Sequence, residues 1–113
     1  MKYKYFVMDN ERKGTCYHEF YRGEWDEVTF WKKDSIFLHD DILNECKDLV
    51  NAFKEVLPLY SDTSETRINS DEWDKIGQII REKDVKAQEI YDEASRWLKE
   101  VFSDYGCFTI LGI

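Results

Sequence analysis

The chain of 113 residues contains little that would interrupt or cross-link a fold. It has one proline and five glycines, so we expect regular elements joined by short connections. Its cysteines, Cys16, Cys46 and Cys107, are odd in number and form no C-x-x-C pair, which argues against a disulfide framework or a zinc site. No apolar run approaches the ~20 residues of a membrane helix, and Lys2 and Lys4 interrupt the N-terminal stretch where a signal sequence would lie. The sequence therefore predicts a cytoplasmic protein without a membrane association.

Motifs for catalysis and cofactor binding are also missing. The sequence has no G-x-G-x-x-G, no Walker loop and no H-E-x-x-H. Histidine and acids cluster once, at His39, Asp40 and Asp41, and the only other histidine is His18. We interpret this cluster as acids at a helix start beside a solvated histidine, because a metal site needs more ligands. We therefore expect a protein that is not an enzyme and that has no cofactor and no bound metal.

The high content of apolar and aromatic residues predicts one globular domain over residues 1–113. Apolar residues make up 42% of the chain and aromatic residues 16%. Such a composition is too rich for a disordered acidic tail, and the length is sufficient for a single hydrophobic core.

The first 31 residues show the pattern of a three-strand meander. Residues 3–8 alternate, residues 15–21 are rich in strand-favouring types, and residues 25–31 form a less regular third candidate. The last seven residues, 107–113, contain almost no polar side chains, and we expect them to insert into the same sheet as a C-terminal strand.

The middle of the chain shows helical periodicity. Residues 40–57 have apolar residues at three- and four-residue steps and stop at Pro58. Residues 59–69 are predicted to be a long polar loop, and Ser70 is a candidate N-cap for the helical region 71–104. The apolar period slips near residues 82–84, so this region is either two helices or one bent helix. Gly106 is placed to end it.

The expected fold class is α+β. An antiparallel sheet, made of the N-terminal meander and the C-terminal strand, carries two or three helices on one face. The order is three strands, then the helices, then a strand, or a variant in which helices interrupt the strands.

Charge is the most uneven property of the chain. The net charge is −8, and residues 24–74 alone carry nine more acidic than basic residues. A concentrated negative field repels nucleic acid and anionic membranes, and it accelerates encounter with a basic protein. The sequence therefore predicts a partner-binding protein whose partner is basic.

The candidate partner-binding residues are the acids of this segment and three aromatic residues among them. The aromatic residues are candidate anchors at the centre of an interface, and the acids are candidates for steering. The acids are Glu24, Asp26, Glu27, Asp40, Asp41, Asp62, Glu65, Asp71, Glu72 and Asp74, and the aromatic residues are Trp25, Tyr60 and Trp73.

In general character the chain resembles the small acidic immunity proteins of bacterial polymorphic-toxin and contact-dependent inhibition systems. The resemblance rests on the size, the acidic aromatic-rich middle segment and the end of the chain, with Trp97, Leu98, Phe102 and the apolar residues 108–113. The resemblance implies a non-catalytic inhibitor that binds a cognate basic toxin domain. It does not identify any residue of this chain as a known contact.

Two other interpretations remain at this point. A phage or mobile-element protein that mimics nucleic acid would also be acidic, although regularly spaced acids and a larger net charge are typical of such mimics. A small metal-dependent hydrolase would use the His39 cluster. The sequence leaves the oligomeric state and the identity of the partner open.

Overall fold

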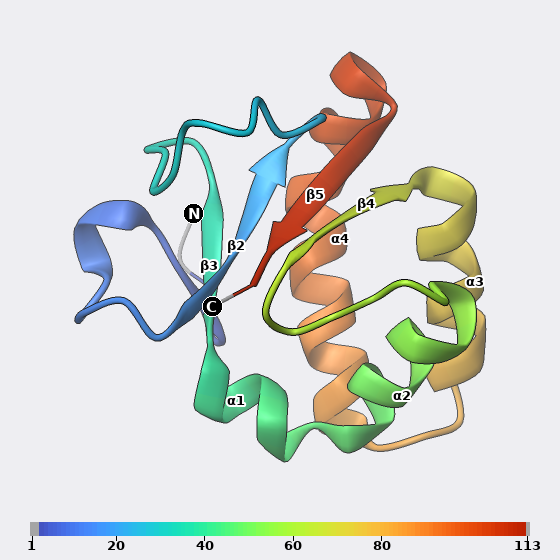
Figure 1. Ribbon diagram of the computed structural model, residues 1–113. Coiled ribbons are helices and arrows are strands. Elements are labelled where there is room, and N and C mark those ends of the chain that lie inside the picture. The colour runs from blue at the N-terminus through green and yellow to red at the C-terminus, as the bar shows by residue number, and fades with distance from the viewer. Residues whose placement is uncertain (1–2, 113) are drawn as a thin grey trace.

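The computed structural model describes residues 3–112 and has a five-stranded sheet with four helices (Figure 1). The strands are β1 (Phe6–Val7), β2 (Tyr17–Arg22), β3 (Ile36–His39), β4 (Glu65–Asn69) and β5 (Cys107–Leu111). The helices are α1 (Asp40–Glu45), α2 (Lys47–Val56), α3 (Ser70–Ile80) and α4 (Val85–Tyr105), and a 3-10 turn, η1 (Asp9–Glu11), follows β1. The α+β class predicted from the sequence is confirmed.

The strands are all antiparallel and lie in the order β1-β3-β2-β5-β4. The C-terminal strand β5 is interior, since Thr109 lies opposite Tyr21 of β2 on one side and opposite Arg67 of β4 on the other. Its insertion into the sheet is therefore confirmed. Strand β1 pairs with β3 instead of its sequence neighbour β2, so β1 and β4 are the two edge strands.

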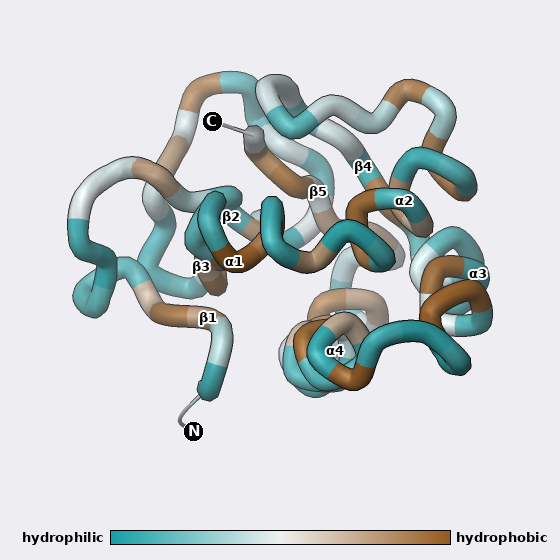
Figure 2. The backbone as a smooth tube through the Cα atoms, turned by 90° about the horizontal axis from the view of Figure 1, so that it is seen from below, coloured by the Kyte–Doolittle hydropathy of each residue, from teal (hydrophilic) through white to brown (hydrophobic). Residues whose placement is uncertain are grey.

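The hydrophobic core lies between one face of the sheet and the helices (Figure 2). Large side chains from both layers are fully buried there. They include Phe20, Ile36 and Phe108 from the strands and Phe53, Ile76 and Leu98 from the helices. The rings of Phe20 and Phe108 stack on neighbouring strands at 5.4 Å, so the sheet contributes a continuous aromatic layer to this core.

The helix boundaries follow local capping. Asn69 is the N-cap of α3, one residue before the predicted Ser70, and its side chain accepts from the Glu72 N–H at 2.8 Å while the Glu72 carboxylate accepts from the Asn69 N–H. The period slip near residues 82–84 marks a true break, because α3 ends at Ile80 and α4 begins at Val85. Gly106 ends α4 in the left-handed region, with φ of 77°.

Three expectations about local structure are wrong. Residues 40–57 form two helices with a break at Cys46, and residues 25–31 form no strand. The predicted loop 59–69 contains strand β4, in which Thr66 and Ile68 are buried and their neighbours are exposed. This alternation suits a half-covered strand.

The second face of the sheet is covered by an irregular segment, residues 24–35, which we call the 24–35 loop. Phe37 points to this face, and it is fully buried because the Trp31 ring packs on it with centroids 5.6 Å apart. The sheet is therefore enclosed between helices and a loop. No helix within residues 3–112 is long and apolar enough to cross a membrane.

Candidate protein-binding surface

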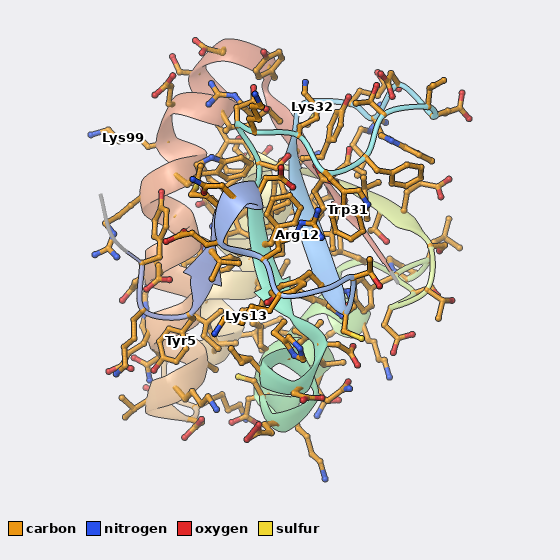
Figure 3. All side chains as sticks on the ribbon, turned by 90° about the vertical axis from the view of Figure 1, so that its left-hand side faces the viewer. Tyr5, Arg12, Lys13, Trp31, Lys32 and Lys99 are labelled. Carbon is orange, nitrogen blue, oxygen red and sulfur yellow. The ribbon has the colours of Figure 1, made fainter. Side chains whose placement is uncertain are left out.

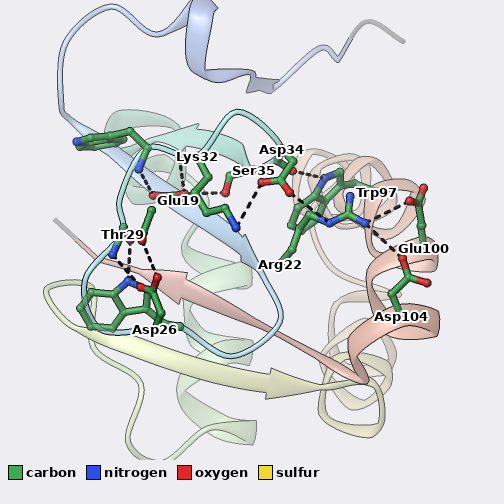
Figure 4. A network of polar contacts seen from close by, with 12 residues as sticks. Glu19, Arg22, Asp26, Thr29, Lys32, Asp34, Ser35, Trp97, Glu100 and Asp104 are labelled. Carbon is green, nitrogen blue, oxygen red and sulfur yellow. Dashed lines mark hydrogen bonds and ion pairs between the residues drawn. The ribbon is translucent and has the colours of Figure 1, made fainter.

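The 24–35 loop is held by a buried carboxylate. Glu19 lies in the middle of β2 with its side chain under the loop, and it is 2% exposed. Its oxygens accept hydrogen bonds from the Trp31 N–H at 2.7 Å, the Lys32 N–H at 3.1 Å and the Ser35 hydroxyl at 2.6 Å (Figure 4). These bonds take the place of strand pairing for residues 31 and 32, which explains why the predicted third strand does not form.

A second carboxylate forms a turn at the start of the loop. Asp26 accepts from the N–H groups of Val28 and Thr29 at 2.9 and 2.8 Å, and from the Thr29 hydroxyl (Figure 4). The hydrogen bonds from Thr29, and then from Val28, lower the pKa of Asp26 from 3.8 to about 2. Because the lowered pKa belongs to the folded state, this turn adds stability above about pH 4 and loses it as the pH falls through about 2.

Ring and chain contacts fix the rest of the loop. Figure 3 shows Arg12 against Trp31, and the guanidinium lies 3.9 Å from the ring centroid. At the far end, the Asp34 carbonyl accepts from the Trp97 indole N–H at 3.3 Å, and the Asp34 carboxylate lies 3.8 Å from Arg22 (Figure 4). The loop is thus tied to β2, to the segment before it and to α4.

Two residues of the loop have strained backbone conformations, which persist only where surrounding contacts stabilise them. Glu27 and Trp31 have φ of 67° and 57°, in the left-handed region that residues other than glycine rarely adopt. Long irregular loops that are held in place by hydrogen bonds to the underlying strands are typical of binding sites on a scaffold. The 24–35 loop is therefore the leading candidate for a functional surface.

The loop displays apolar side chains to solvent. Val28 is 77% exposed and Phe30 is 53% exposed, and the Phe30 ring leans on Trp25 with centroids 5.2 Å apart. Beside Phe30 lies a mostly apolar hollow of about 240 Å³, whose walls include Tyr17, Trp31 and Leu111. An exposed aromatic ring next to an apolar hollow is the arrangement that a protein partner buries most favourably.

Acidic residues border these apolar side chains. Glu24, Trp25, Glu27 and Glu65 line one hollow of about 370 Å³ together with Arg67, which lies 3.5 Å from Glu24. The fold thus brings together candidates that are 38 residues or more apart in sequence, from the loop and from β4. With Asp26, they form a surface that combines anchors with negative charge, which we call the loop–β4 surface.

The candidates near α1 lie elsewhere. Asp40 is half-buried, where it contacts His18 at 2.8 Å and accepts from Asn44 at 2.9 Å. Tyr60 is partly buried against Phe53, and burial together with Asp62 and Asp40 raises the pKa of Tyr60 to about 12. These contacts make Asp40 and Tyr60 parts of the fold, whereas Asp41 and Asp62 remain exposed.

The candidates at the start of α3 divide in the same way. Trp73 is 3% exposed and its indole N–H donates to Ser95 at 2.9 Å, so its proposal as a surface anchor is wrong. Trp73 belongs to the buried stripe with Ile76 and Ile80. Glu72 is taken up by the capping box, and Asp71 and Asp74 are exposed beside it.

The His39 cluster is also explained by capping. The His39 Nδ1 accepts from the Asp41 N–H at 3.0 Å at the start of α1, and His18 is fully buried on β2. Within residues 3–112, no group of three or more histidine, cysteine or acidic side chains has an arrangement able to hold a metal ion. The three cysteines are free thiols.

Several basic residues lie on the side of β1 and β3. Figure 3 views this side and labels Arg12, Lys13, Lys32 and Lys99, of which Lys32 belongs to the 24–35 loop itself. Two of them are paired with acids, since Arg12 lies 3.0 Å from Asp9 and Lys32 lies 4.0 Å from Asp34.

Sequence reasoning identified the acids and Trp25 of this surface but missed Glu19, Val28 and Phe30. Glu19 is an acid within an apolar strand, and this pattern is the signal by which a buried, hydrogen-bonded carboxylate could have been found. Val28 and Phe30 were assigned to a strand, and nothing in the local pattern distinguishes them from core residues.

Comparison of the chain with protein-family models, curated proteins and solved structures found no match.

Proposed function

We propose that this protein is a non-catalytic, cytoplasmic inhibitor that binds a basic partner protein, acting as an immunity protein for a cognate toxin domain. The observation that carries the proposal is the 24–35 loop, an irregular segment that is hydrogen-bonded to the buried Glu19 and leaves Phe30 and Val28 exposed near acidic residues. A surface fixed before binding loses little conformational freedom when the partner docks. Inhibition follows when the docked surface covers the partner's active site or the surface next to it.

The charge of the surface supports a basic partner. Glu24, Glu27 and Glu65 lie around the hollow on the loop–β4 surface, with Arg67 as the one basic side chain lining it. Complementary charges at the rim of an interface mainly raise the association rate, and the apolar centre slows dissociation. A tight inhibitor needs both properties.

The test begins with capture of the partner from a lysate of the host, using the tagged chain at low and moderate salt. We expect a basic protein at both salt concentrations, which stops growth when expressed alone and is tolerated when this chain is co-expressed. A captured protein that is harmless, or that remains toxic in the presence of the chain, would contradict the proposed inhibition.

Charge reversal tests the role of the acids in the same complex. The triple variant Glu24→Lys, Glu27→Lys, Glu65→Lys should associate at least about tenfold more slowly at low salt, with a flatter salt dependence. The control triple, Glu45→Lys, Glu55→Lys, Glu82→Lys, changes the net charge equally at exposed sites outside this surface. Equal slowing in both triples, measured by stopped-flow kinetics, would show that only net charge matters.

A further inference from the structure

The two edge strands of the sheet differ in whether their outward backbone groups have hydrogen-bond partners. At the β1 edge, the Glu93 carboxylate of α4 accepts from the backbone N–H groups of Lys4, Tyr5 and Phe6, at 2.9, 2.8 and 2.8 Å. Glu93 is 4% exposed, and its bond from the Phe6 N–H is buried while the other two bonds are partly buried. The β1 edge is therefore closed to another strand.

The β4 edge is open. Gly112 donates its N–H to the Ser64 carbonyl at 3.1 Å, which sets the alternation of the ladder between β4 and β5. Thr66 and Ile68 then turn their backbone groups to β5, and Glu65 and Arg67 turn theirs outward. Asn69, the next outward residue, donates its N–H to Glu72. Within residues 3–112, no strand, turn or side chain takes up the outward groups of Glu65 or Arg67.

We infer that this free edge of β4 binds an extended, basic segment of the partner as an added strand of the sheet. The choice of a basic partner rests on the proposed function. Four unpaired backbone groups on Glu65 and Arg67 offer the hydrogen bonds, since an added strand repeats the pairing that β5 makes on the other side.

The acidic residues around the β4 edge favour a basic segment as the added strand. Glu65 lies on the edge itself, with Glu24 and Glu27 in the adjoining hollow and Asp71 exposed just after the strand. Arg67 is the one basic residue of β4, and it lies 3.5 Å from Glu24. A second copy of this chain would add its own Glu24, Glu27 and Asp71 to the acids at this edge, whereas lysine or arginine at alternate positions of a partner strand would lie among acids.

The added strand would also adjoin the loop–β4 surface. Glu65 and Arg67 line the hollow that Trp25, Glu24 and Glu27 form beneath the loop. A partner that pairs with β4 therefore reaches the apolar side chains of the loop with its neighbouring residues, and the two contacts make one continuous interface.

The experiment uses the whole chain and a short peptide in which lysine alternates with valine. The matched variants are Arg67→Pro and Arg67→Thr: both remove the side chain, and only the first removes the outward N–H and blocks the edge. Amide signals in nuclear magnetic resonance spectra report which residues the peptide contacts and how fast each amide exchanges.

We expect the peptide to slow exchange of the Glu65 and Arg67 amides in the wild-type chain. Arg67→Thr should bind it within about twofold of the wild type, and Arg67→Pro at least tenfold more weakly. Equal binding by the two variants, equal binding of a peptide with glutamate in place of lysine, or a shift of amides away from β4 would overturn the inference. So would a concentration-dependent dimer that protects the same amides without peptide.

If Arg67→Pro does not fold, Glu65→Pro and Glu65→Thr replace the pair of variants. In either case, the exchange rates of the Glu65 and Arg67 amides in the wild-type chain, with and without peptide, test the inference. The peptide result is independent of the captured partner. A captured toxin that binds Arg67→Pro as tightly as Arg67→Thr would remove the edge from the interface and leave the proposed function intact.

Discussion

Replacing Glu19 by alanine is expected to lower the free energy of unfolding by about 3–5 kcal/mol, because three donors lose a buried acceptor. The donors are the Trp31 N–H, the Lys32 N–H and the Ser35 hydroxyl. The Ser35 hydroxyl is buried and the two N–H groups are partly buried, so water replaces the lost acceptor only in part. Urea unfolding measures the loss, and hydrogen exchange at residues 31–35 should accelerate more than in the helices.

Glu93 provides the matched control for this prediction. It is also a buried glutamate with three donors, but these are all backbone N–H groups and belong to residues 4–6. Glu93→Ala should cost a similar free energy of unfolding and accelerate exchange at the β1 end, leaving the 24–35 loop protected. A loss below about 1 kcal/mol for Glu19→Ala, the value typical of an exposed side chain, would mean that Glu19 does not hold the loop.

Removing the two exposed apolar side chains of the loop should have the largest effect on binding. The double variant Val28→Ser, Phe30→Ser is expected to weaken the complex with the captured partner by at least about a hundredfold, the range of a central interface anchor. Its unfolding free energy should change by less than about 1 kcal/mol, because both side chains are exposed in the free protein. Calorimetric titration measures the affinity.

The control for this double variant uses equally exposed apolar residues on other parts of the molecule. Leu59 is 91% exposed in the loop after α2, and Val85 is 67% exposed at the start of α4. Leu59→Ser, Val85→Ser should bind the partner as tightly as the wild type. If this control loses as much affinity as the loop variant, the partner covers a different face.

Helix positions were predictable because they depend on periodicity along the chain. The stripe formed by Trp73, Ile76 and Ile80 predicts α3, and the loss of that period near residue 83 predicts the break before α4. The same stripe placed Trp73 in the core, but the neighbouring Glu72 and Asp74 suggested a surface position. For a residue within a helix, the residues three and four positions away determine its burial better than its immediate neighbours.

The loop and the edge strand depend on contacts between distant residues, which the sequence does not display. Residues 25–31 have strand-forming types, but Asp26 and Glu19 take up the N–H groups that a strand would need. Strand β4 contains a readable alternation around Ile68, yet it forms because β5, some 40 residues later, supplies its partner. In residues 25–31 and in β4, contacts with distant residues determine the structure more strongly than local propensity does.

The central claim is that the partner docks on the 24–35 loop and the adjoining β4 strand. Hydrogen exchange of the chain, alone and in complex with the captured basic protein, tests it most directly. We predict slower exchange in the complex at residues 24–31 and 65–67, and unchanged exchange in the turn at residues 81–84. Protection confined to α1, α2 or the side of β1, with residues 24–31 unaffected, would contradict the account.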